Sequence, residues 1–274
     1  DVYKRQEFAR VSGPFCGEGN VQRPQTSSSL CAETMTVEIR IDSLAFGGRG
    51  VGRLDGKAVF VPGTAPGDLI RCRTVREKKR HAEAELVEVL EPSPLRAQPP
   101  CPVAHECGGC QWQHLPYEKQ LVWKEKIFRD LLVRQAGVDG AKVLSILPSV
   151  KEWGYRSRVQ FKCRMTEGGF VMGFYRAGSH YVVDMARCPI TDERLNDLLP
   201  ALRSLLGASP FASVIPQIDM AVGDDGRCRV VIHFLGPDPD AFHRWLKQPA
   251  RKMEASLFVP VSYTHLTLPT NREV

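Results

Sequence analysis

The stretch CPVAHECGGC, residues 101–110, holds three of the nine cysteines of this chain. Their spacing is C-x5-C-x2-C, and Cys188, in the sequence ARCPI, is a candidate fourth partner. Soft thiolate ligands select zinc or iron–sulfur clusters over hard cations. The stretch therefore predicts a four-thiolate metal site that joins one loop to a distant segment of the fold.

The division of the ligands favours a cluster over a single zinc ion. Structural zinc sites typically take two ligands from each of two loops, whereas here one loop offers three thiols and a distant strand end offers one. Such a three-plus-one division is common in iron–sulfur ligation. Gly108 and Gly109 would also let a bulky cluster approach the backbone. A zinc ion and unliganded cysteines remain the alternatives, while the five-residue gap and the fourth cysteine argue against the open-iron loop of radical-SAM enzymes.

The composition is that of an ordinary globular protein, with 43% hydrophobic and 25% charged residues in 274. There is no apolar run long enough for a membrane span and no signal-peptide pattern, so we expect a cytoplasmic protein. In a reducing compartment, cysteines indicate metal binding or reactive thiols more than disulfides. The formal net charge of +6 leans mildly toward polyanionic partners.

Residues 35–93 alternate between short apolar-polar runs and glycine or proline turns. Four or five short strands are expected, among them 36–41, 58–62, 69–75 and 82–90, and a glycine-rich turn at 47–52 leads into Arg53 and Leu54. This pattern predicts a small closed barrel of the OB type. The glycine-rich turn opens no helix, so it fails the structural test for a phosphate-binding loop.

A cluster of basic residues lies in the second half of this barrel, where residues 71–81 contain a single acid, Glu77. The basic residues are Arg71, Arg73, Arg76, Lys78, Lys79 and Arg80. On a small barrel such a hairpin would present positive charge to the phosphates of RNA. The alternative is a solvated hairpin tip without a ligand.

Residues 96–247 predict an α+β module with antiparallel pairing. A helix is expected over 117–135, stopped at Gly137, and a second one from an Asp192 cap to Gly207. The expected strands are 153–163, 170–176, 180–185, 218–222 and 229–234. Arg156 and Arg158, two apart, should share one strand face and contact RNA or carboxylates.

Three further cysteines, Cys72, Cys163 and Cys228, fall at buried phases of expected strands, so we interpret them as small core residues.

Both ends of the chain lack the periodic strand and helix patterns of residues 35–247. Residues 1–34 are expected to be a disordered or artefactual leader before a start at Met35, with a flexible native extension as the alternative. Residues 248–274 are expected to be the start of a linker followed by an artefactual tail that resembles sequencing-adapter read-through.

The first module resembles a TRAM domain, the small RNA-binding barrel of several RNA-modifying enzymes. The motif AFGGRGVGR at 45–53 carries this resemblance, together with VPG at 61–63 and PGD at 66–68. The resemblance implies that residues 36–91 bind RNA.

Further motifs resemble one family, the bacterial SAM-dependent RNA uracil-5-methyltransferases that act on ribosomal RNA and carry a TRAM domain and a [4Fe–4S] cluster. They are the C-x5-CGGC run, WQHL at 112–115, YRSR at 155–158, MGFYRAGS at 172–179 and CPI at 188–190. The resemblance implies that Cys101, Cys107, Cys110 and Cys188 are cluster ligands.

In that family the chemistry belongs to a C-terminal Rossmann-like domain, which binds S-adenosyl-L-methionine and supplies a cysteine nucleophile. Reaching the uracil ring would require flipping the base out of its stack. We assign no catalytic or SAM-binding residue here and expect an N-terminal fragment, inactive alone, that lacks that domain.

Two functions of other classes stay open. One is a standalone iron–sulfur protein that binds RNA without catalysis, and the other is a zinc-stabilised nucleic-acid module. The sequence favours a monomer but does not fix the oligomeric state, the modified uridine or the choice between ribosomal and transfer RNA.

Overall fold

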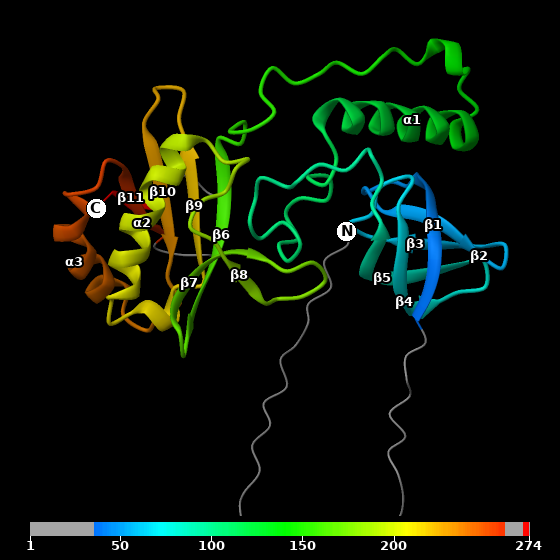
Figure 1. Cartoon of the computed structure of the whole chain (residues 1–274). Helices are drawn as coiled ribbons and strands as arrows, with labels where there is room; N and C mark the ends of the chain where they lie inside the picture. Colours follow the sequence, from blue (N-terminus) through cyan, green and yellow to red (C-terminus); the bar gives the residue numbers. More distant parts are fainter. Residues whose placement is uncertain (1–35, 261–270, 274) are drawn as a thin grey trace, which may run out of the picture. The chain divides into compact units, whose positions relative to one another are not determined.

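The computed structural model describes residues 36–260 and 271–273. Both expected features at the chain ends, the leader at 1–34 with its start at Met35 and most of the tail, lie outside the described residues. The described part contains a closed barrel, a loop-and-helix segment and a seven-stranded sheet (Figure 1). Among these residues, no helix is both long and apolar enough to cross a membrane.

The barrel consists of five strands in the closed order β1-β2-β3-β5-β4, which confirms the expected small barrel. The strands are β1 (Thr36–Leu44), β2 (Gly50–Leu54), β3 (Lys57–Val61), β4 (Leu69–Glu77) and β5 (His81–Glu91). Only the β3–β5 pair is parallel. Alternate residues point inward, so Ile39, Ile41, Val59, Val61, Ile70, Cys72, Ala82 and Ala84 form the core.

The glycine at the start of β2 is required by close packing. A Cβ atom on Gly50 would lie 1.9 Å from Oγ1 of Thr64. Thr64 is fully buried, and its hydroxyl donates to the Val61 carbonyl oxygen. The GRGVG motif therefore lets the turn before β2 pack tightly against the loop that follows β3.

Helix α1 (Tyr117–Ala136) ends where the sequence predicts. Gly137 adopts φ 64°, and its N–H donates to the Leu132 carbonyl, so it caps the helix. The short 3-10 helix η1 (Gly140–Lys142) follows. None of the residues of α1 is fully buried, but Trp123 and Ile127 are partly buried and pack against the cluster of Leu44, Ala65 and Leu115.

The seven-stranded sheet has the order β12-β11-β10-β9-β6-β7-β8. Its strands are β6 (Arg158–Thr166), β7 (Gly169–Tyr175), β8 (Val182–Asp184), β9 (Gln217–Val222), β10 (Cys228–His233), β11 (Ser256–Pro260) and β12 (Asn271–Glu273). The helical elements are α2 (Glu193–Gly207), η2 (Ala212–Val214) and α3 (Pro239–Ala250). Leucines of α2 share one hydrophobic core with Phe242 and Leu246 of α3 and with inward residues of the central strands, and Figure 1 shows both helices beside this sheet.

Three expectations for this module need correction. First, the strand predicted from Trp153 begins only at Arg158. Gly154 adopts φ 64°, and the backbone N–H groups of Gly154 and Arg156 donate to the carbonyls of Pro189 and Ile190 instead of to a strand ladder. The alternating side chains at 153–157 therefore belong to a loop.

Second, the boundary placed at residue 247 cuts through α3, which runs to Ala250, and β11 extends the same sheet to Pro260. Third, the pairing is not entirely antiparallel. Strand β11 pairs in parallel with β10, and α3 supplies the crossover that a parallel pair needs.

Candidate metal and nucleic-acid site

The four candidate cysteines come together around one small cavity. Its lining is largely apolar and includes Phe174, Met185 and Ile190 besides Cys101, Cys107, Cys110 and Cys188. Cys101 and Cys188 are 7% and 6% exposed, whereas Cys107 and Cys110 are half-buried. The loop and the distant segment thus meet as the spacing predicted.

The loop that carries three of the cysteines is fastened to the end of β7. The Gly108 N–H donates to the Tyr175 carbonyl at 2.9 Å. A Cβ atom on Gly108 would lie 2.9 Å from that same oxygen, so a side chain at this position would break the contact. The guanidinium of Arg176 also pairs with Glu106 at 2.7 Å.

Cys188 is positioned by a residue that sequence reasoning missed. The buried Asn196 on α2 accepts the Cys188 N–H at 2.9 Å and donates its amide to the carbonyls of Cys188 and Thr191, both at 3.1 Å. The sequence signal for this role was an asparagine among the buried leucines of α2. A buried amide needs hydrogen-bond partners, so its position indicated a structural contact.

The chemistry of the donor set suits a thiolate-binding metal group. Burial raises the pKa of the Cys101, Cys107 and Cys110 thiols, and thiolates nearby raise it further. Metal ligands must be deprotonated, and a bound cation offsets the cost of gathering such thiolates. Within residues 36–260 and 271–273, however, no three His, Cys, Asp or Glu side chains are arranged to hold one metal ion.

The other three cysteines are structural, as expected. Cys72, Cys163 and Cys228 are 0%, 7% and 7% exposed in strands of the two cores. Burial raises the pKa of Cys163 to about 12. A thiol in this state stays protonated and unreactive at neutral pH.

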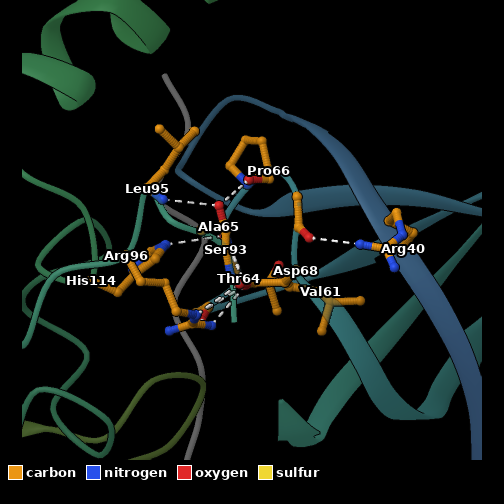
Figure 2. A network of polar contacts seen from close by, with 12 residues as sticks. Arg40, Val61, Thr64, Ala65, Pro66, Asp68, Ser93, Leu95, Arg96 and His114 are labelled. Carbon is orange, nitrogen blue, oxygen red and sulfur yellow. Dashed lines mark hydrogen bonds and ion pairs between the residues drawn. The ribbon is translucent and has the colours of Figure 1, made fainter. Parts of the chain in front are cut away.

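A buried carboxylate joins the barrel to the segment that leads into the cysteine loop (Figure 2). Asp68 is fully buried and accepts the N–H groups of Ala65 and Ser93 at 2.6 and 2.8 Å. Arg96 donates to it from Nε and Nη2, both at 2.9 Å, and from Nη2 also to the Gly63 carbonyl. All the hydrogen-bonding capacity of this carboxylate is therefore engaged.

His114 provides a second polar contact between the barrel and the cysteine-bearing segment. Its Nε2 donates to the Thr64 carbonyl at 3.1 Å, and its own carbonyl accepts the Ala97 N–H at 2.9 Å. Leu115, which follows it, packs with Leu44 and Ala65. The WQHL motif thus packs against Thr64 and Ala65, the residues just before the PGD motif.

The six basic residues of the barrel divide into two groups. Arg71 pairs with Glu38 and Glu88, and Arg73 pairs with Glu85, at 2.7–2.8 Å. The side chains of the other four have no partner in the part of the chain that the structure describes: they are Arg76, Lys78, Lys79 and Arg80. Free positive charge therefore gathers at the β4–β5 turn.

Arg156 and Arg158 line one groove on the sheet face opposite α2 and α3, although only Arg158 lies in a strand. The groove has a volume of about 730 Å³ and also contains Asp219 and Arg229. The Arg156 guanidinium lies near Cys110, whose thiol pKa it lowers against the larger effect of burial.

Residues 36–95 match the family model described as tRNA (uracil(54)-C(5))-methyltransferase, TRAM domain. Among curated proteins, the chain is 41% identical to an uncharacterized RNA methyltransferase of Thermosynechococcus vestitus, over 67% of this chain and 41% of that protein. It is 36% identical to the 23S rRNA (uracil(1939)-C(5))-methyltransferase RlmD of Azoarcus sp., over 67% and 43%. The RlmD protein of Cupriavidus metallidurans is 35% identical, over 80% and 48%.

A solved structure shares the fold. It is Pyrococcus abyssi tRNA (uracil-54, C5)-methyltransferase in complex with S-adenosyl-L-homocysteine, with a TM-score of 0.59, 21% identity, and coverage of 84% of this chain and 52% of that one. The chain thus carries a TRAM domain and is homologous to RNA methyltransferases, which confirms that part of the expectation. It spans about two fifths to one half of the length of the curated relatives.

The buried His114 makes a testable contribution to pH-dependent stability. Burial is the largest cause that lowers its pKa, and Arg96 lowers it too, while the Thr64 hydrogen bond and Asp68 raise it. The unfolded chain then binds a proton near pH 6.5 that the folded chain binds only at lower pH. Stability is therefore full above the unfolded pKa and falls as the pH drops below it.

We expect the free energy of unfolding to fall between pH 7.5 and 5.5, and to fall less in His114→Gln, which keeps an amide donor for Thr64. Urea unfolding at several pH values measures this difference. His105→Gln, at an exposed position, is the control and should keep the wild-type pH dependence. An equal pH dependence in wild type and His114→Gln would contradict the assignment.

Proposed function

We propose that this chain is the RNA-recognition part of a SAM-dependent methyltransferase that forms 5-methyluridine in ribosomal RNA. The observation that carries the proposal is the TRAM barrel, fastened through Asp68 and His114 to the segment that leads into the cysteine loop. Two relatives, matched over 67% and 80% of this chain, are named for 23S rRNA uracil-C5 methylation. The structural neighbour, named for tRNA, supports the fold and does not bear on the choice of RNA.

The barrel would bind the RNA backbone through the unpartnered cations at the β4–β5 turn. Lys78, Lys79 and Arg80 are free to approach phosphates, and binding through phosphates releases counterions. Arg71 and Arg73 were predicted to join them, but their ion pairs with neighbouring strands favour a supporting role on the barrel wall. Arg156 and Arg158 would offer a second contact from the sheet groove.

The methyl transfer itself would use SAM, together with a nucleophile and a base that we assign to no described residue. The curated relatives are about twice as long as the part that this chain matches. We propose that the catalytic groups of the whole protein lie in the remaining part of that length. The present residues would then bind and orient the RNA.

We further propose that Cys101, Cys107, Cys110 and Cys188 hold a [4Fe–4S] cluster. All four cysteines line one cavity, and the supply of three thiols by one loop and of the fourth by a distant segment favours a cluster over a single zinc ion. When bound by four thiolates, the cluster would leave no iron open for chemistry and would fix the cysteine loop against β7 and α2.

Removing the unpartnered cations should weaken RNA binding and flatten its salt dependence. Each phosphate contact to a single strand contributes about 0.7 to the slope of log K against log salt. We expect the triple variant Lys78→Ala, Lys79→Ala and Arg80→Ala to reduce the slope by about 2, measured by fluorescence anisotropy with a single-stranded rRNA oligonucleotide.

The matched control removes three cations near the end of α3, through Lys247→Ala, Arg251→Ala and Lys252→Ala. It should keep the slope within about 0.5 of wild type. An unchanged slope in the hairpin variant would show that the β4–β5 turn is only solvated surface.

The metal proposal is tested on anaerobically purified protein. We expect iron, acid-labile sulfide and visible absorption in wild type, and their loss in Cys107→Ser. Cys72→Ala, in the barrel core, should keep them. Stoichiometric zinc without sulfide would overturn the cluster and leave a zinc site at the same cysteines.

A further inference from the structure

A pocket of about 640 Å³ lies between the cysteine loop, the start of α1 and the segment that follows α1. This segment returns along the helix. The Ile146 N–H donates to Glu125 at 3.0 Å, and the Ser149 N–H donates to the Tyr117 hydroxyl at 2.6 Å. These contacts bring Trp153 and Tyr155 into the same pocket wall as Trp112.

The aromatic side chains leave ring surface available to a ligand. Trp153 is 39% and Tyr155 is 53% exposed, which is unusual for two large rings so close in sequence. Trp112 is held in place, since a Cβ on Gly48 would lie 2.9 Å from its ring and Lys124 Nζ lies 5.4 Å from the ring centroid. Exposed rings on a supported wall are the elements on which the bases of single-stranded nucleic acids stack.

The charges of the pocket select a neutral ligand with hydrogen-bond donors. Lys124 and Lys151 line it, but Glu118 and Glu152 do so as well, so the pocket is not a site for an anion alone. Neither carboxylate has a partner in the described residues. A carboxylate accepts hydrogen bonds only, and it pairs well with the exocyclic amino group of a base.

We propose that this pocket binds one unpaired nucleobase that carries an exocyclic amino group, such as adenine or cytosine, within the RNA. The base stacks on Trp153 and Tyr155, and Glu152 accepts its amino group. Uracil offers no amino donor and binds more weakly. This inference rests on the proposed RNA-binding function and adds a base-reading site outside the barrel.

The test compares single-stranded RNA oligonucleotides of equal length, one containing adenines and one only uracils, by anisotropy. Wild type should bind the adenine-containing strand several-fold more tightly. The double variant Trp153→Ala and Tyr155→Ala should lose roughly tenfold or more in affinity for it. The slope of log K against log salt should be the same for this double variant as for wild type, because no phosphate contact is removed. Glu152→Ala, which removes the acceptor, should lose the preference for adenine over uracil.

Tyr181→Ala is the matched control. Tyr181 is 60% exposed and does not line the pocket, so its removal should leave affinity and base preference unchanged. Thermal unfolding of each variant shows whether it folds. If the double variant is unfolded, quenching of wild-type tryptophan fluorescence by adenosine monophosphate, stronger than by uridine monophosphate, is the deciding measurement.

Different outcomes test the RNA-binding function and the base-binding pocket. Wild-type protein that binds neither oligonucleotide would overturn the proposed function and the pocket with it. Wild-type binding that the double variant and Glu152→Ala leave unchanged would overturn the pocket alone. Equal quenching by both nucleotides would likewise overturn it.

Discussion

The buried carboxylate of Asp68 is the interaction on which the arrangement of the recognition segments depends. It sits in the loop after β3 and accepts from that loop, from Ser93 and from Arg96. A buried charge is tolerated only when it is paired and fully hydrogen-bonded. Its burial therefore requires the chain after the barrel to fold back onto the barrel, and that same chain leads directly into the cysteine loop.

The same requirement explains how polar and charged groups are divided. Buried polar groups are used to fix backbone: Asp68 fixes the exit from the barrel, and Asn196 fixes Cys188. Arginines on the barrel wall pair with acids of neighbouring strands. Charged side chains without a partner among the described residues lie, among other places, at the β4–β5 turn and in the aromatic pocket, and at these two places we propose that RNA binds.

Local patterns in the sequence predicted much of this structure. Alternating apolar and polar runs identified the barrel strands, the Asp192 cap and Gly207 gave the ends of α2, and Gly137 gave the end of α1. The convergence of the four cysteines also followed from their spacing. Each of these features depends on neighbours close in sequence or on a motif of unusual composition.

The features that were missed depend on partners distant in sequence. The alternation at 153–157 looked like a strand, but the backbone there pairs with residues 189–191. Strand β11 joins the sheet through a parallel pairing with β10 that no local sequence pattern predicts. The exposed apolar residues of α1 show that spacing predicts a helix but not what covers it. Asp68 stood within a recognised motif, yet its burial could be seen only in the fold.

Amide hydrogen exchange of the Asp68→Asn variant tests whether this carboxylate holds the barrel and the cysteine-bearing segment together. If Asp68 couples the barrel to the cysteine-bearing segment, residues 93–97 and 112–115 should lose protection together with the loop at 61–68. The strands β6, β9 and β10 should keep theirs. A loss of protection confined to residues 61–68 would contradict the account, because it would show that the barrel and the cysteine loop are held independently of this carboxylate.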